Sequence, residues 1–467
     1  MHHGMDESGG LMGNAGWIVD ATAFAAQELL LFAAIGFLIG GIDDLAIDFI
    51  WVREKLRGRL RPVAASTLTP PCAPLAIFVP AWDESSVIGA MLGHLTATLG
   101  EPDLRIFVGT YPNDPATIAA VAAHAERDPR IRLVVLPHPG PTTKADCLNG
   151  LWRALLRDEQ AAGCRFAGVV MHDAEDVAHP LELRVLGAML ADAMAAQLPV
   201  LPLVVPGSPL ISGHYCDEFV EAHGRQLPVR DALGAALPLA GVGCALRRDL
   251  LVAIAARRGG DPFDASSLTE DYEMGLAVAR EGGRTRFACA TDDDGAPVAV
   301  RGYFPATIDT AVRQKARWMT GIALAGWDRT GWGDRASPIE WWMRMRDRRA
   351  ILAVITLACA YLGLMLSGAL FVVTGAFGPA DRSPVTWLLL VTAFLLIWRV
   401  MWRTYWVAKS YGGATAMLAL PRLIVGNVIA MLAARRAMVQ YLGLMRGKAL
   451  RWDKTAHHFP SNAEIGA

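Results

Sequence analysis

The sequence is poor in charged residues, and its charges show no excess of either sign. The first observation argues against an ordinary soluble protein, and the second against a nucleic-acid-binding one. Only 19% of the 467 residues are charged, whereas 53% are hydrophobic and the mean hydropathy is +0.31. Soluble chains of this size are more polar, so part of this one is expected to lie in lipid. The 44 basic and 45 acidic side chains nearly cancel. Because no global basic field is present, a nucleic-acid partner is not expected.

The sequence also lacks paired cysteines and a cleavable leader. Its seven cysteines are scattered and never form a C-x-x-C pair, which argues against a disulfide framework and a structural zinc site and suits a reducing cytoplasm. No positive charge precedes the first apolar run, and no small-residue cleavage site follows it. We therefore expect this run to remain attached as an anchor.

What the sequence does contain is long apolar runs. Two of them, 351–377 and 387–407, are each long enough to cross about 30 Å of hydrocarbon. The piece between them, 378–384, is short and turn-rich, so the two runs predict a transmembrane hairpin. A third run, 21–42, is also a candidate span. The sequence thus predicts about three transmembrane helices.

A fourth apolar run, 414–434, has a different character. Pro421, Arg422 and Asn427 interrupt it, and basic residues follow its end. Short apolar stretches with basic flanks are typical of helices that lie in the membrane interface. We interpret this run as a C-terminal interfacial helix, with a membrane span as the alternative.

Basic residues indicate which ends of the spans face the cytoplasm. They follow the first run and precede the second, and such residues stay on the cytoplasmic side. They are Arg53, Lys55, Arg57, Arg59, Arg61, Arg344, Arg346, Arg348 and Arg349. The predicted organisation is an N-terminal tail (1–20), a transmembrane anchor (21–52), a cytoplasmic domain (53–345), a transmembrane hairpin (346–410), and an interfacial helix with a cytoplasmic tail (411–467).

The expected cytoplasmic domain alternates strands with helices. Short buried runs predict strands at 75–79, 105–109, 132–136 and 168–171, with alanine-rich helical segments between them. This alternation predicts an α/β fold with a mostly parallel sheet covered on both faces. Ligands of such sheets bind at the carboxyl ends of the strands. The polar residues that follow these strands are therefore candidate site residues.

Four short motifs occur in an order that resembles a known enzyme family. Residues 80–84 (Pro-Ala-Trp-Asp-Glu) close the first strand, and 173–176 (Asp-Ala-Glu-Asp) follow the fourth. Residues 269–271 (Thr-Glu-Asp) come next, and 314–318 read Gln-x-x-Arg-Trp shortly before the hairpin. Over roughly 70–330 the chain resembles the processive family 2 glycosyltransferases, which include bacterial cellulose and hyaluronan synthases. The resemblance implies a nucleotide-sugar-binding GT-A domain and sugar transfer coupled to membrane passage.

The acidic motif after the fourth strand is the candidate metal site. A nucleotide sugar carries a diphosphate whose charge must be neutralised when the nucleotide leaves, and Mg²⁺ or Mn²⁺ held by hard oxygen ligands does this. Asp173 is the expected ligand, with Glu175 or Asp176 as its partner, because the family's usual form is Asp-x-Asp. The alternative is an acidic cluster at a helix N-terminus, which the helix dipole favours.

The Thr-Glu-Asp motif supplies the expected catalytic carboxylates. An inverting transfer needs a general base that takes the proton of the acceptor hydroxyl. The resemblance assigns this base to Asp271, with Glu270 beside it. The same residues also fit a helix start, with Thr269 or Ser267 as N-cap. Both interpretations can hold, since a helix N-terminus would fix the loop that presents Asp271.

In the Gln-x-x-Arg-Trp motif, helical spacing places Gln314, Arg317 and Trp318 on one face. Arg317 can pair with diphosphate oxygens in a bidentate manner, and the indole of Trp318 can stack on the acceptor sugar. The alternative is an interfacial helix with basic and aromatic anchors. We also expect Gly243 and Cys244 on the acceptor side.

Further residues are expected around the nucleotide. The complete expected set is Pro80, Trp82, Glu84, Asn113, Asp114, Lys144 and Asp173. Lys144 opens a segment that resembles the family's Lys-Ala-x-x-Leu-Asn sequence. The family's second strand usually ends in an Asp-Asp-Gly-type turn that holds uracil and ribose, and this turn is missing here. Asn113 and Asp114, or Asp83 and Glu84, are expected to replace it.

Three segments carry a narrower resemblance. Residues 79–85, 108–114 and 452–460 are similar to the bacteriophage N-four adsorption protein B family. Its members are glycosyltransferases of the bacterial inner membrane that work with an outer-membrane partner to make and secrete an exopolysaccharide used as a phage receptor. The resemblance implies an inner-membrane location and a donor such as UDP-N-acetylmannosamine or a related UDP-N-acetylhexosamine.

The predicted function is therefore a processive, inverting, metal-dependent glycosyltransferase that polymerises a sugar from a UDP-sugar and secretes the product. The expected partners are the UDP-sugar, the growing polysaccharide, the lipid bilayer, and an outer-membrane or periplasmic secretion protein. One alternative is a non-processive transferase acting on polyprenyl phosphate, although such relatives generally lack Gln-x-x-Arg-Trp. Another is an inactive phage-receptor or secretion scaffold, against which the retained motif residues argue.

Overall fold

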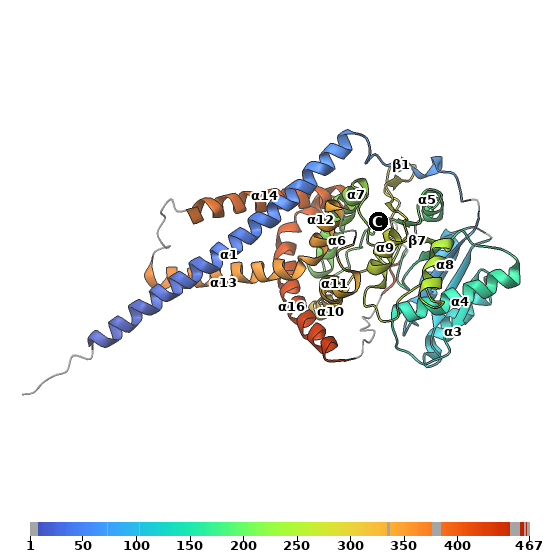
Figure 1. Cartoon of the computed structure of the whole chain (residues 1–467), viewed down its shortest axis with the longest axis horizontal. Coiled ribbons are helices and arrows are strands. Elements are labelled where there is room, and N and C mark those ends of the chain that lie inside the picture. The colour runs from blue at the N-terminus through green and yellow to red at the C-terminus, as the bar shows by residue number, and fades with distance from the viewer. Residues whose placement is uncertain are drawn as a thin grey trace, which may run out of the picture.

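The computed structural model describes residues 8–448, apart from Cys72, Pro102, 334–336 and 376–383, together with 458–461 and Glu464. Figure 1 shows an α/β unit at one end of the molecule and long helices extending from the other. Several shorter helices lie between these two parts.

A seven-stranded sheet forms the centre of the α/β unit, with the order β4-β3-β2-β5-β7-β6-β8. Its strands are β2 (Leu75–Pro80), β3 (Arg105–Thr110), β4 (Ile131–Val135), β5 (Gly168–Met171), β6 (Ala195–Gln197), β7 (Cys244–Arg247) and β8 (Thr285–Phe287). Only β7 runs antiparallel to its neighbours. The predicted mostly parallel sheet is confirmed, and the four predicted strands are β2 to β5. A separate pair joins β1 (Val63–Ala64) to β9 (Ala290–Thr291).

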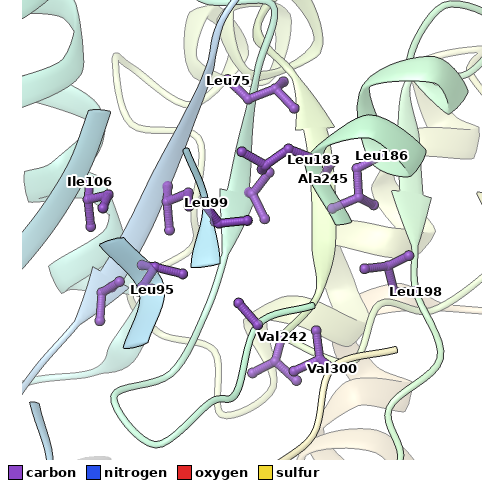
Figure 2. Close-up of a cluster of buried hydrophobic side chains, with 14 of the residues drawn as sticks. Leu75, Leu95, Leu99, Ile106, Leu183, Leu186, Leu198, Val242, Ala245 and Val300 are labelled. Carbon is purple, nitrogen blue, oxygen red and sulfur yellow. The ribbon is translucent and has the colours of Figure 1, made fainter. Parts of the chain in front are cut away.

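Helices cover both faces of the sheet, because alternate strand residues point to opposite sides. In β2, Leu75, Ile77 and Val79 join the hydrophobic cluster in Figure 2, whereas Ala76 and Phe78 join a second one. The first face packs against α2 (Ile88–Thr98), α3 (Pro115–Ala125) and α5 (Glu182–Met189). The second packs against α4 (Lys144–Ala162), α8 (Arg248–Arg257) and α9 (Glu270–Arg280). The carboxyl ends of the strands thus remain open for a site.

The segments beside the sheet are mainly helical. They comprise η1 (Ala65–Thr67), α6 (Ile211–Glu221), η2 (Ala222–Gln226), α7 (Leu227–Ala232), α10 (Ile308–Trp318), η3 (Met319–Leu324), α11 (Ala325–Thr330), α12 (Pro338–Arg348) and α15 (Gly413–Ala416). The segments η2 and η3 are π-helical. Such bulges are frequent at functional sites, and η3 directly continues the helix that carries the Gln-x-x-Arg-Trp motif.

Four helices within the described residues are long and apolar enough to cross a membrane. They are α1 (Ser8–Leu56), α13 (Ala350–Thr374), α14 (Pro384–Tyr411) and α16 (Ala419–Met445). The three predicted spans correspond to α1, α13 and α14, and the fourth helix, α16, contains most of the run predicted as an interfacial helix with a membrane span as the alternative. Helix α1 also begins at Ser8, so it extends through the described part of the segment expected to be a tail. The hairpin turn, including Asp381, lies outside the described residues.

Glycines allow α1 to pack closely against the two helices of the hairpin. A side chain at Gly36 would collide with Thr356 of α13, and one at Gly41 would collide with Leu395 of α14. A side chain at Gly363 of α13 would likewise collide with Leu30 of α1. Small residues at such crossings are typical of membrane helices, whose association depends on close packing.

Helix α16 runs across the direction of α13 and α14 in Figure 1. It touches the α/β side of the molecule along most of its length. Near its start, Arg422 bonds Asp217 of α6 at 3.0 Å; in its middle, Ala433 packs on Ala316 of α10; near its end, Tyr441 bonds Asp328 of α11 at 2.7 Å. These contacts fit the predicted interfacial helix, although its length and composition would also allow a span.

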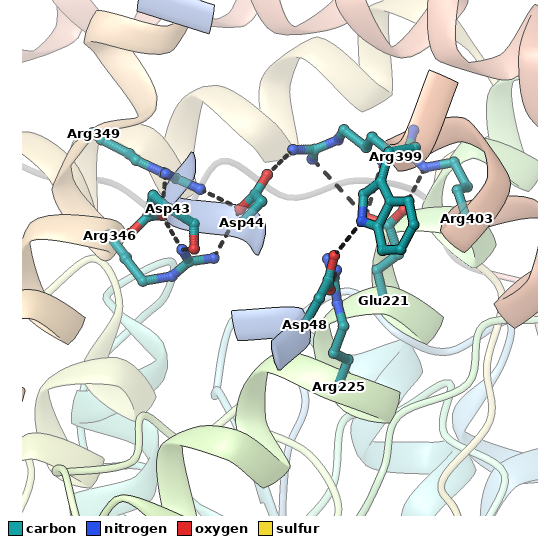
Figure 3. A network of polar contacts seen from close by, with 10 residues as sticks. Asp43, Asp44, Asp48, Glu221, Arg225, Arg346, Arg349, Arg399 and Arg403 are labelled. Carbon is teal, nitrogen blue, oxygen red and sulfur yellow. Dashed lines mark hydrogen bonds and ion pairs between the residues drawn. The ribbon is translucent and has the colours of Figure 1, made fainter. Parts of the chain in front are cut away.

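A network of ion pairs joins the long helices to the α/β unit (Figure 3). It consists of Asp43, Asp44 and Asp48 of α1, Glu221 of α6, Arg225 of η2, Arg346 of α12, Arg349 at the start of α13, and Arg399 and Arg403 of α14. Asp48 pairs with Arg225, and Arg403 pairs with Glu221 at 2.9 Å. We call this set the junction network.

Candidate active site

A cavity of about 330 Å³ opens at the carboxyl ends of the central strands. This volume is within the range of roughly 300–1,000 Å³ that is typical of small-molecule sites. Residues from all four sequence motifs line it. They include Pro80, Glu84, Lys144, Asp173, Glu175, Asp176, Glu270, Asp271, Gln314, Arg317 and Trp318. Side chains that are more than two hundred residues apart in the sequence therefore line the same cavity.

Lys144, the first residue of α4, lies at the centre of the carboxylates. Its Nζ is 2.6 Å from Asp173 Oδ1 and 3.9 Å from Glu270 Oε1, and it donates a hydrogen bond to the carbonyl oxygen of Gly241 at 3.3 Å. Burial opposes the lysine's charge, but the neighbouring carboxylates outweigh burial and raise its pKa. Lys144 therefore stays charged and holds the first acidic motif beside the second.

The carboxylates of the Thr-Glu-Asp motif are crowded and buried. Burial, followed by the charge of Asp271, raises the pKa of Glu270 to about 7. Burial also raises the pKa of Asp271. The positive charges of Lys144 and Arg317 act to lower it, but their effect is smaller. With Asp173 nearby, three carboxylates surround a single lysine. The cavity is therefore short of positive charge.

Glu270 and Asp271 are the first two residues of α9, so the Thr-Glu-Asp motif begins a helix, as predicted. Thr269 is the N-cap residue, but its side chain makes no capping bond. Instead Ser267 Oγ accepts the backbone N–H of Thr269 at 3.2 Å and donates to Glu273 at 2.7 Å. The predicted helix start is confirmed, and the loop before it is fixed by Ser267. Thr269 Oγ1 is buried and lacks a hydrogen-bond partner among the described residues.

Gly241 allows the close approach of these groups, and sequence reasoning missed it. Its φ is +79°, and a Cβ there would lie 2.5 Å from Asp271 Oδ2 and 3.3 Å from Lys144 Nζ. Both the backbone conformation and the space therefore require glycine. The only local signal is its Gly-Val-Gly context in the loop before β7.

The loop after β5 is held by a buried histidine that sequence reasoning also missed. His172 Nδ1 lies 3.2 Å from Asp176 Oδ2, and its Nε2 lies 2.8 Å from Glu182 Oε1. The same Asp176 oxygen accepts the backbone N–H of Asp173 at 2.9 Å. Burial opposes protonation of His172, but the two carboxylates raise its pKa to about 10. Asp176 thus has a structural role in this loop, whereas Asp173 faces Lys144.

The Gln-x-x-Arg-Trp motif forms the other side of the cavity from α10. Thr307 caps this helix by accepting the N–H of Thr310 at 3.3 Å. Gln314, Arg317 and Trp318 all line the cavity, and Gln314 Oε1 is buried with no hydrogen-bond partner in the described part of the chain. A buried, unpaired carbonyl oxygen beside a cavity is expected to receive a donor from a ligand.

Aromatic side chains surround Trp318. Its ring centroid lies 6.1 Å from that of Tyr215, 6.2 Å from that of Phe219 and 6.5 Å from that of Phe304. Phe219 and Phe304 also line the cavity. The indole is therefore fixed in the cavity wall, and its two aromatic neighbours extend an apolar surface that sequence reasoning did not foresee.

Some predicted nucleotide contacts lie outside this cavity. Asn113 is bonded to Gly140 in both directions, at 2.7 and 2.8 Å. Asp114 caps α3 by accepting from Thr117 N at 3.3 Å and also accepts from Asp83 N at 2.6 Å. These residues shape the loop after β3, so their contact with a nucleotide remains a prediction.

The remaining three predicted residues also do not line the cavity. Trp82 packs edge-on against Tyr111, with ring centroids 5.3 Å apart. Gly243 has φ +56° and backs onto Val300, and Cys244 is buried within the sheet. The loop before β7 instead reaches the cavity through Ala240 and Val242. Gly243 and Cys244 therefore support the cavity wall from behind.

Comparisons with known proteins agree with this arrangement. A family model described as "Glycosyltransferase like family 2" matches residues 70–321. The chain belongs to this glycosyltransferase family. The glycosyltransferase is 34% identical over 480 residues to Bacteriophage adsorption protein B of Escherichia coli strain K12. It is equally similar to Bacteriophage N4 adsorption protein B of Escherichia coli O157:H7. The match covers 95% of this chain but 64% of each relative, so the chain spans less than two thirds of their length.

Solved glycosyltransferases are more distant. Mannosyltransferase PcManGT from Pyrobaculum calidifontis, in complex with GDP-Man and Mn²⁺, has a TM-score of 0.49 and 18% identity, covering 84% of this glycosyltransferase and 98% of that chain. Glucosyl-3-phosphoglycerate synthase from Mycobacterium tuberculosis, with Mn²⁺, UDP and glucosyl-3-phosphoglycerate, has a TM-score of 0.34 and 16% identity, covering 56% and 82%. The predicted family and enzyme class rest on the family model and the closer relatives, which confirm them.

Proposed function

We propose that this glycosyltransferase polymerises a sugar from a UDP-sugar donor by inverting transfer and passes the product across the bacterial inner membrane. The observation that carries the proposal is the convergence of two sets of side chains on one cavity. Lys144, Asp173 and Asp271 make up its acidic part, and Arg317 and Trp318 come from α10, which packs against the long helix α16. Such an arrangement suits a charged donor held between the acidic groups and Arg317, with the growing chain at the aromatic surface around Trp318.

Asp271 is the general base in this proposal. It would take the acceptor hydroxyl proton as the hydroxyl oxygen forms a bond to the sugar carbon and the nucleotide diphosphate leaves from the opposite face. Burial raises the pKa of Asp271, which makes its carboxylate a stronger base than an exposed one. The backbone N–H of Tyr272 donates to Asp271 Oδ1 at 2.7 Å, Gly241 leaves room for this carboxylate, and the start of α9 presents it.

Asp173 and Glu175 are the side chains we assign to a divalent cation. Within the described residues no group of three or more His, Cys, Asp or Glu side chains is placed to hold an ion by itself, so the donor's phosphates and water would complete the coordination. The excess of carboxylate around Lys144 fits a cation. When bound, Mg²⁺ or Mn²⁺ would neutralise the charge of the leaving diphosphate. Asp176 is assigned to the loop scaffold because its Oδ2 already accepts from His172 and Asp173.

Arg317 and Gln314 complete the donor side, and Trp318 receives the acceptor. The guanidinium group of Arg317 would bind diphosphate oxygens in a bidentate manner. Gln314 Oε1, buried without a partner in the described residues, would accept a sugar or water hydrogen. The fixed indole of Trp318 would stack on the terminal sugar of the growing chain. The roles proposed for Gln314, Arg317 and Trp318 thus combine what the family resemblance implies with the positions of these side chains on α10.

The donor we propose is a UDP-N-acetylhexosamine such as UDP-N-acetylmannosamine, and the product is an exopolysaccharide. The resemblance to phage adsorption proteins supports this choice. It also supports a periplasmic or outer-membrane secretion partner and a role in phage adsorption. The catalytic cavity would face the cytoplasm, where nucleotide sugars are made, as the arginine-rich ends of the spans suggest.

Product analysis tests the proposal. The full chain in lipid nanodiscs is supplied with each UDP-sugar and with Mg²⁺, Mn²⁺ or a chelator. We expect a long polymer from one UDP-N-acetylhexosamine with either metal and none with the chelator. A single sugar transferred to added polyprenyl phosphate would instead support the non-processive alternative. No nucleotide release from any donor would favour the inactive scaffold.

A further inference from the structure

A second hollow lies on the opposite side of α10 from the active-site cavity. It is a groove between α10 and α16, and we call it the α10–α16 groove. Its lining residues are Ile308, Asp309, Val312, Leu432, Arg435, Arg436, Val439 and Gln440. By contrast, Thr310, Gln314 and Arg317 of the same helix line the active-site cavity. One helix therefore separates the two sites.

The groove combines apolar walls with positive charge. Ile308, Leu432 and Val439 are exposed by 47%, 43% and 66%, so their apolar surface is accessible. Arg435 is exposed as well. Asp309 could neutralise it, but the Asp309 carboxylate pairs with Arg313 at 2.8 Å within α10. The groove thus keeps an arginine charge beside apolar surface, a pairing that suits an amphiphile with an anionic head.

The groove is continuous with an apolar stripe on α16. Residues on one face of this helix are exposed, and they recur at helical spacing. They are Leu420, Ile424, Val428, Leu432, Val439, Leu442 and Met445. The opposite face, with Arg422, Ile429, Ala433 and Ala437, is buried against the rest of the protein. Because the exposed apolar face belongs to a helix beside the long apolar helices, lipid is the medium expected to cover it.

We propose that the α10–α16 groove binds the headgroup phosphate of an anionic phospholipid of the bilayer. Arg435 binds the phosphate, as arginine commonly does, and Ile308, Leu432 and Val439 contact the upper part of the acyl chains. Arg436 lines the same groove. A bound lipid would then pack against the outer side of the helix that carries Gln314, Arg317 and Trp318. This site is independent of the sugar donor.

Lipid selectivity of the reconstituted full chain tests this proposal. Spin-labelled phosphatidylglycerol and phosphatidylcholine are compared in vesicles of phosphatidylcholine. We expect the protein to prefer the anionic label and Arg435→Ala to reduce that preference about five-fold, the effect of removing one basic residue at an anionic surface. Arg435→Lys should retain most of the preference. Arg435 is exposed, so these variants are expected to fold, and unchanged thermal unfolding checks this.

Arg446→Ala is the matched control, because Arg446 is an exposed arginine at the C-cap of α16 that does not line the groove. It should leave the preference unchanged. If Arg435→Ala and Arg446→Ala lose the same amount of preference for the anionic label, the preference comes from general surface charge and the proposed site is wrong. A wild-type preference in Arg435→Ala would overturn it too. Displacement of the label by polyprenyl monophosphate, but not by unlabelled phosphatidylglycerol, would assign the groove to a carrier lipid and refute the phospholipid.

Discussion

The charges around Lys144 and those of the junction network are both largely buried, but they are balanced differently. In the cavity, one lysine serves Asp173, Glu270 and Asp271. In the junction network, four carboxylates meet Arg225, Arg346, Arg349, Arg399 and Arg403. Buried ions are stable when paired and hydrogen-bonded. The charges of the junction network therefore satisfy one another, whereas the carboxylates of the cavity outnumber the lysine beside them and could accept a further cation or donor group.

The largest expected effect is at the unbalanced cluster. Asp271→Asn preserves the shape of the side chain but cannot accept a proton, so we expect turnover to fall by about 10²- to 10⁴-fold with donor affinity little changed. Nucleotide release and donor binding are measured separately. Asp249→Asn, on the surface of α8 with a side chain that is 53% exposed, is the control and should remain active. Near-normal turnover of Asp271→Asn would assign the base to another carboxylate.

At the balanced cluster, a substitution should affect stability instead. Arg403→Ala leaves Glu221 buried without its 2.9 Å partner, and breaking a buried pair typically costs about 3–5 kcal/mol. Thermal or denaturant unfolding in detergent measures this loss. The double variant Glu221→Gln/Arg403→Met removes both charges and should recover much of it. If the double variant is as unstable as Arg403→Ala, the loss comes from packing and not from the unpaired charge.

The crowding of carboxylates around Lys144 can also be tested through the pH dependence of stability, because Glu270 belongs to this cluster. Its pKa is raised from 4.5 to about 7, so between these values the folded state binds the proton that the unfolded state releases. Stability should therefore fall as pH rises from 4.5 to 7, by on the order of 1–3 kcal/mol. Glu270→Gln should flatten this part of the pH profile of unfolding. A profile identical to that of the wild type would show that the carboxylate does not titrate as proposed.

The smallest expected effect concerns Trp318. Aromatic packing contributes on the order of 1 kcal/mol beyond area burial, so Trp318→Ala should shorten the polymer several-fold while nucleotide release continues. Arg317→Ala, which removes a proposed diphosphate contact, should depress nucleotide release itself. Product length and nucleotide release are measured in parallel. Equal loss of both outputs in the two variants would contradict separate roles, and full-length polymer from Trp318→Ala would leave it a structural residue of the aromatic wall.

The sequence predicts β2 to β5 because these strands are short buried runs with turn residues nearby, whereas it does not predict β6, β8 or the antiparallel β7. Leu75–Pro80 and Gly168–Met171 are clear examples. It also predicts Asp173, which lies two residues after the end of β5, whereas Asp271, in the first turn of α9, is expected from the family resemblance. Their proximity to Arg317 could be expected only from the family resemblance, because no local pattern encodes a contact across such a sequence distance.

Other features depend on contacts that the sequence does not reveal. Asn113 bonds to Gly140, 27 positions away, and His172 bridges Asp176 and Glu182 from a buried position. A polar residue in a loop does not itself indicate whether it meets a ligand or the backbone. The orientation of α16 is likewise set by its packing on α10. Its composition is compatible with both a span and an interfacial helix.

Helix α6 has a practical consequence for anyone who wishes to isolate the α/β unit. It carries Phe219 in the cavity wall and, two residues later, Glu221, whose partner Arg403 belongs to α14. Arg225 in the following turn depends on Asp48 of α1 in the same way. A water-soluble fragment of residues 53–345 would lack both partners. Expression trials should therefore retain α1 and α14, or replace Glu221 and Arg225 together with uncharged residues.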